Sequence, residues 1–69
     1  MSFYASVKFG GKKYRLDYAE EPRISLVPQV LRMFRHGILC QGAPVSTKVE
    51  GTWYLVSKHG DKVSIRREG

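Results

Sequence analysis

The stretch that decides the fold is FYASVKFGGKKYRLDY, residues 3–18, in which two alternating runs flank a glycine pair. Apolar and polar side chains alternate on both sides of Gly10-Gly11, as in half-buried β-strands. A two-residue turn needs positive φ angles, which glycine adopts without strain. These features predict an antiparallel hairpin whose apolar face pairs Phe9 with Lys12, Val7 with Tyr14, Ala5 with Leu16 and Phe3 with Tyr18.

The other face of this hairpin places Lys8 directly opposite Lys13, on the side that also carries Tyr4, Ser6, Arg15 and Asp17. Like charges that face each other across a strand pair repel. An anionic ligand would relieve the repulsion, and protection of a sheet edge against aggregation would also explain the lysines. Lys8 and Lys13 are therefore candidate nucleic-acid contacts.

A helix is predicted next, over residues 26–36. Its apolar positions fall at i, i+3, i+4 and i+7. Ser25 is suited to the N-cap, and Gly37 is suited to the left-handed residue that ends a helix. The apolar stripe comprises Val27, Val30, Leu31 and Phe34.

The remainder of the chain predicts a three-strand meander over residues 45–49, 52–57 and 62–66, with turns at Glu50-Gly51 and His59-Gly60. Before it, residues 38–40 form a short apolar run, which is either a strand or a buried connection. Pairing the strand residues outward from these two turns places one set of apolar side chains on the face toward the helix. Its expected pairs are Val45 with Val56, Thr47 with Tyr54, Val56 with Val63, and Tyr54 with Ile65.

These elements predict a single α+β domain over residues 1–69, in the order β-β-α-(β)-β-β-β. One helix packs on an antiparallel or mixed sheet. A β-grasp arrangement is the alternative, and it requires the last strand to lie parallel beside the first.

Charge and cysteine content limit the possible functions. The 69 residues carry a formal net charge of +6, and such an excess attracts polyanions. The single cysteine, Cys40, excludes an intramolecular disulfide. No apolar run is long enough to span a bilayer, and the first residues lack the features of a signal peptide. We therefore expect a cytoplasmic protein with no membrane partner.

The outer face of the meander holds the strongest candidate site. Trp53 is predicted to lie between Lys48 and Arg66, with Leu55 and Lys62 nearby. Single-stranded DNA or RNA is often held in this way, since bases stack on an aromatic ring while cations meet phosphates. Alternatively, Trp53 and Leu55 cover a second apolar layer or form a subunit interface.

The predicted helix offers a second basic group. Arg32 and Arg35 project away from the apolar stripe, together with Gln29 and His36. Such a face can lie along phosphates. Alternatively, it is a solvated surface whose cations complement the negative end of the helix dipole.

Catalysis is not expected. Cys40, His36 and His59 are too few for a four-ligand zinc site, and the carboxylates show no pairing suited to acid–base chemistry. A chain of this length also has little volume for a closed pocket. We expect no catalytic residue, metal or cofactor.

The sequence thus predicts a small, basic, non-catalytic nucleic-acid-binding module. The alternative is a protein-interaction or assembly module, either a homo-oligomer or a small regulatory subunit that docks on an acidic partner. The candidate nucleic-acid contacts are Trp53, Lys48, Arg66, Lys62, Arg32, Arg35, Lys8 and Lys13, and the candidate interface residues are Trp53 and Leu55.

Overall fold

The computed structural model describes residues 3–39 and 42–68, and within them it has one helix and five strands. The order β-β-α-β-β-β confirms the predicted α+β class. The elements are β1 (Phe3–Phe9), β2 (Lys12–Tyr18), α1 (Val27–Arg35), β3 (Val45–Val49), β4 (Thr52–His59) and β5 (Lys62–Arg67).

The first hairpin has the predicted register. Phe9 lies opposite Lys12 and Phe3 opposite Tyr18, so every expected pair is present. Both turn residues have positive φ, +59° at Gly10 and +75° at Gly11, as a type I′ turn requires. The glycine pair therefore fixes which residues meet across β1 and β2.

The second half of the meander is shifted by two residues from the prediction. β3 pairs with β4 as expected, with Val45 opposite Val56. In β4 and β5, however, Val56 faces Ile65 rather than Val63. The turn is Gly60-Asp61, not His59-Gly60. Gly60 has φ +65°, and a type II′ turn takes glycine at its first central position. A shift of two residues leaves each side chain on its predicted face.

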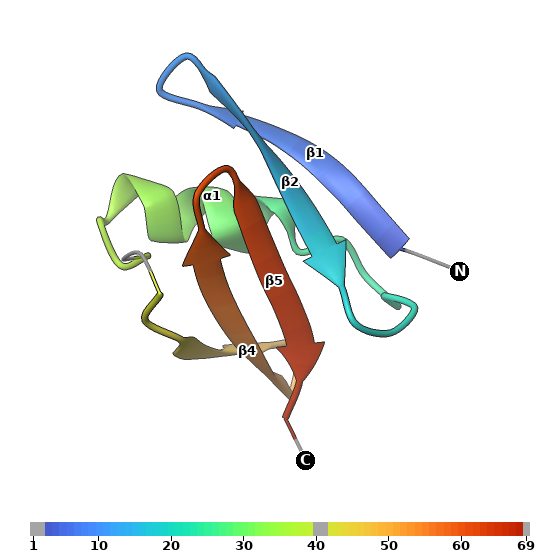
Figure 1. The fold of residues 1–69 in the computed structure, drawn as a ribbon. Coiled ribbons are helices and arrows are strands. Elements are labelled where there is room, and N and C mark those ends of the chain that lie inside the picture. The colour runs from blue at the N-terminus through green and yellow to red at the C-terminus, as the bar shows by residue number, and fades with distance from the viewer. Residues whose placement is uncertain (1–2, 40–41, 69) are drawn as a thin grey trace.

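The five strands form one mixed sheet in the order β1-β2-β5-β4-β3 (Figure 1). β5 runs parallel to β2, with Leu16 opposite Val63 and Tyr18 opposite Ile65, and antiparallel to β4 on its other side. The last strand therefore lies beside the second strand, not the first. The pairing that defined the β-grasp alternative is not the one observed.

The helix is slightly shorter than predicted, with Leu26 at the N-cap position and His36 at the C-cap. The Ser25 hydroxyl still accepts a hydrogen bond from the Val27 N–H, at 3.3 Å. Gly37 ends the helix in the left-handed region at φ +64°. The N–H groups of Gly37 and Ile38 donate to the carbonyls of Phe34 and Met33, which is the Schellman arrangement.

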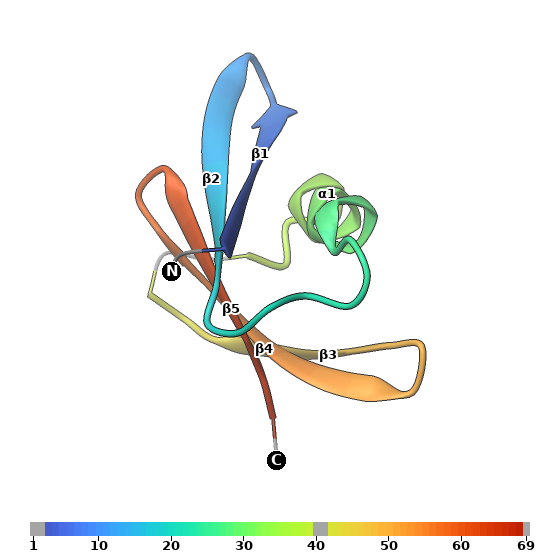
Figure 2. The same cartoon turned by 90° about the vertical axis from the view of Figure 1, so that its right-hand side faces the viewer.

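The core lies between α1 and one face of the sheet (Figure 2). Val30 and Met33 are the fully buried helix residues, whereas Val27, Leu31 and Phe34 pack around them. Met33 was not part of the predicted stripe. The buried sheet residues come from four strands and include Val7, Leu16, Tyr54, Val56, Val63 and Ile65. Within the described residues, no helix lies over the opposite face of the sheet (Figure 2).

The segment after the helix is not a strand where the structure describes it. Leu39 is buried and Ile38 is exposed, and both lie outside the strands. The Cys40 part of this prediction lies outside the described residues. The described part is therefore a connection, as in the second of the two expected possibilities, but only Leu39 in it is buried.

Candidate nucleic-acid interface

The uncovered face of the sheet, here called the outer face, is built from every second residue of each strand. Alternation turns one set of side chains toward α1 and the other set away from it. Six of the twelve Lys and Arg residues, all exposed, point away from α1 in this way. They are Lys8, Lys13, Arg15, Lys48, Lys62 and Arg66.

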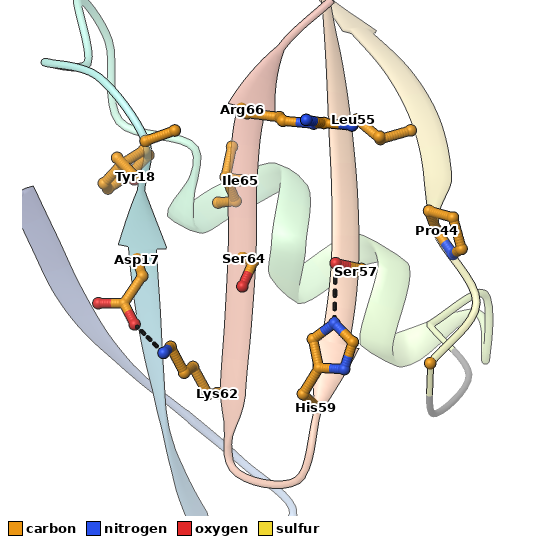
Figure 3. A pocket seen from close by; sticks show the side chains of 12 residues that line it. Asp17, Tyr18, Pro44, Leu55, Ser57, His59, Lys62, Ser64, Ile65 and Arg66 are labelled. Atoms are coloured by element: carbon orange, nitrogen blue, oxygen red, sulfur yellow. Dashed lines mark hydrogen bonds and ion pairs between the residues drawn. The ribbon is translucent and has the colours of Figure 1, made fainter.

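A shallow groove of about 470 Å³ crosses the middle of the outer face, over β2, β5 and β4 (Figure 3). Ser57 and Ser64 are direct partners on β4 and β5 and supply short side chains near its centre. Lys62 and Arg66 stand on β5 to either side of Ser64, and His59 approaches Ser57 at 3.2 Å. The groove thus has small hydroxyl groups at its centre, cations on β5 and apolar side chains toward β3.

Asp17 fixes two of the cations. Its Oδ1 accepts a hydrogen bond from Arg15 Nε at 2.8 Å, and Lys62 Nζ lies 3.4 Å from Oδ2. Partial burial alone would raise the pKa of Asp17, but hydrogen bonds and charge from Arg15 and Lys62 outweigh it. The pKa is therefore lowered from its ordinary value. An ionised Asp17 holds Arg15 and Lys62 side by side on the parallel strands β2 and β5.

Trp53 lies on the outer face, as predicted, but one of its expected neighbours is wrong. Its side chain is 48% exposed, and Lys48 Nζ on β3 lies 5.9 Å from the ring centroid. Because of the two-residue shift, Arg66 pairs with Leu55 instead of with Trp53. Figure 3 shows the Arg66 side chain extending from β5 toward Leu55. Trp53 is thus flanked by one cation, and Arg66 belongs to the groove.

A second exposed aromatic was not predicted to contribute. Tyr4 on β1 is 61% exposed, and the Arg15 guanidinium carbon lies 4.3 Å from its ring centroid. Alternation in the sequence places both residues on this face. The stacking itself has no sequence signal, because it depends on Asp17 holding the guanidinium in place.

The remaining predicted contacts are divided between two layers. Lys8 and Lys13 face each other on the outer face of the first hairpin, beyond the groove. Arg32 and Arg35 are exposed on α1, which packs on the inner face (Figure 2). The structure therefore brings together six of the eight predicted nucleic-acid contacts on one side of the sheet and leaves these two arginines on the other.

Residues 3–39 and 42–68 hold no cluster of metal ligands and no membrane-spanning helix. No three His, Cys, Asp or Glu side chains gather there as metal ligands would. Within the same residues, no helix is long and apolar enough to cross a membrane.

Comparisons of the chain with protein-family models, with curated proteins and with solved structures found no match.

Proposed function

We propose that this chain is a small, non-catalytic module that binds nucleic acid on the outer face of its sheet. The observation that carries the proposal is the gathering of six exposed cations and exposed Trp53 on the one face that α1 leaves uncovered. A solvated sheet face needs polar side chains, but it does not need this excess of one charge. Cys40 gives no reason to place the module outside the cytoplasm.

The division of roles follows from the chemistry of the side chains. Lys62 and Arg66 flank the groove and are suited to contact phosphates. Trp53 offers a ring on which a base can stack, beside the Lys48 ammonium. Lys8 and Lys13 extend the positive surface along the first hairpin. Phosphate contacts release counterions, so affinity should fall steeply with salt.

The test is a fluorescence-anisotropy titration of labelled oligonucleotides of about 12 nucleotides at about 50 and 200 mM salt. We expect binding at the lower salt and much weaker binding at the higher. Changing both Lys62 and Arg66 to Ala should weaken binding about tenfold, from about 0.7 kcal/mol for each exposed ionic contact. It should also reduce the slope of log affinity against log salt by about 1.4.

The matched control is the double variant Arg32→Ala, Arg35→Ala. It removes the same charge from the helix side of the molecule, and we expect less than about a twofold change in affinity. Equal losses in the two double variants would show that net charge alone drives binding. Absence of binding to any oligonucleotide at low salt would refute the proposed function.

An assembly module is the second candidate, favoured by one observation. Trp53 is half exposed and neighbours the partly exposed Leu55 on β4, next to the edge strand β3, and exposed apolar surface near a sheet edge is typical of interfaces. Sedimentation equilibrium of the wild type and of Leu55→Lys separates the candidates. Self-association that Leu55→Lys abolishes supports assembly, whereas two monomers of equal thermal stability argue against self-association.

A further inference from the structure

Tyr4 and Trp53 stand near opposite edges of the outer face. Both rings are about half exposed or more, 61% for Tyr4 and 48% for Trp53. Each also has a cation against it, Arg15 at 4.3 Å and Lys48 at 5.9 Å from the ring centroid. The outer face therefore carries two similar cation–aromatic pairs, one on β1–β2 and one on β3–β4.

The strand registers determine how far apart the two rings are. Tyr4 lies opposite Asp17, Asp17 opposite Ser64, and Ser64 opposite Ser57, so these four residues form one row across the sheet. Trp53 is four residues along β4 from Ser57. Three strand spacings of about 4.8 Å and four residues of about 3.3 Å separate the two aromatic residues by roughly 19 Å.

The surface between the two rings is suited to a phosphate backbone. The groove of about 470 Å³ lies there, with Lys62 and Arg66 on either side of Ser64. The short side chains of Ser57 and Ser64 let a backbone approach the sheet. Cations in the middle and rings at both ends match a strand whose phosphates lie in the groove and whose bases turn outward to stack.

This arrangement favours single strands over duplexes. In a duplex the bases are already stacked on one another, and their flat faces are not accessible to protein rings. A single strand can splay its bases apart, so that separated bases reach separated rings. A span of roughly 19 Å is compatible with about four nucleotides or more, near the lower end of known single-strand site sizes.

We infer that the ligand is a single-stranded nucleic acid that crosses the sheet from Tyr4 to Trp53, with a base stacked at each end and its phosphates in the groove. The inference rests on the proposed function and adds to it the strandedness, the path and a second stacking residue, Tyr4. Arg15 is a positioning residue here, because Asp17 holds its guanidinium against the Tyr4 ring.

The experiment measures the affinity of oligothymidylates of about 2 to 12 nucleotides for the wild type, Tyr4→Leu and Tyr4→Phe. Quenching of Trp53, the single tryptophan of the chain, reports contact at the other end of the path. We expect Tyr4→Leu to weaken binding of the longer oligonucleotides at least about fivefold. The shortest ones should bind wild type and variant equally well, with unchanged quenching at saturation. Tyr4→Phe keeps the ring and should bind like the wild type.

The possible outcomes separate the two proposals. If oligonucleotides bind but Tyr4→Leu behaves like the wild type at every length, the crossing path is wrong and the proposed function stands. If a duplex of equal length binds as tightly as the single strand, the inferred strandedness is wrong. If no oligonucleotide binds the wild type, the proposed function itself fails. Equal thermal transitions for the three proteins would show that Tyr4 acts on binding and not on folding.

Discussion

The two faces of the sheet share the same strands but have different compositions. On β5, Val63 is completely buried against the helix layer, whereas its neighbour Ser64 lies on the outer face. Inner residues must fill the space under α1, so packing limits them to apolar types. Outer residues are free of that limit. Packing under the helix therefore does not explain the cations and rings found there, and the proposed binding of nucleic acid is one explanation.

The ring of Tyr14 lies at the rim of the inner face, where the core meets solvent. This ring packs on Phe34 with centroids 4.6 Å apart. The ammonium groups of Lys12 and Lys58 lie 5.6 and 5.9 Å from its centroid. These two lysines belong to the inner face but reach solvent at its rim. An inner-face residue can therefore be charged when it lies at the rim of the core.

The largest expected difference between the faces is in stability. Leu16→Ala removes a completely buried side chain and should lower the free energy of unfolding by about 2–5 kcal/mol. Leu55→Ala on the outer face removes the same atoms from a partly exposed position and should cost less, about 1 kcal/mol. Urea denaturation measures both. Similar losses for the two variants would show that the outer face is also packed.

A smaller effect is expected from the one carboxylate within the groove. Asp17→Asn removes the negative charge that pairs with Arg15 and Lys62. The Asn oxygen can still accept the Arg15 hydrogen bond that positions the guanidinium against Tyr4, so loss of the negative charge should raise the affinity for a single-stranded oligonucleotide about two- to fivefold. Glu50→Gln makes the same change in net charge at the exposed β3–β4 turn and serves as the control. Equal gains in both variants would remove the special role assigned to the groove.

The smallest effect concerns pH. Because the folded-state pKa of Asp17 lies below its ordinary value of 3.8, its ion pairs stabilise the protein above the unfolded-state pKa. That contribution is lost as pH falls through the folded-state pKa. Solvent screening limits it to at most about 1 kcal/mol. Denaturation of the wild type and Asp17→Asn should show the wild type more stable near pH 6 and the difference gone near pH 2. A difference that persists at low pH would contradict this assignment.

Local turn chemistry explains which registers could be predicted. Gly10-Gly11 permits one tight turn, and the pairs of the first hairpin followed from it. Around residues 59–61 only Gly60 has the positive φ that a tight turn requires, and either of two turns could include it. The prediction chose the earlier turn. Because the predicted register was wrong by two residues, Trp53 stayed on the outer face. Arg66, however, pairs with Leu55 and not with Trp53.

Non-local features could not be predicted from the sequence. The parallel pairing of β2 with β5 joins segments far apart in the chain, and no local pattern specifies such a contact. The groove depends on that pairing, because it brings Asp17 beside Lys62 and Ser64. The Arg15–Tyr4 contact depends in turn on Asp17. The cations and rings of the site were therefore recognisable one by one, but their grouping was not.

The central place of β5 has a consequence for how the chain acquires its structure. β5 follows the other strands in sequence and lies between β2 and β4, so two separate hairpins become one sheet only when it inserts. A nascent chain on the ribosome must wait for residues 62–67 before the apolar sides of both hairpins can be fully sheltered. Until β5 is in place, the edges of β2 and β4 that it pairs with carry unpaired backbone groups, and such edges can pair with other chains.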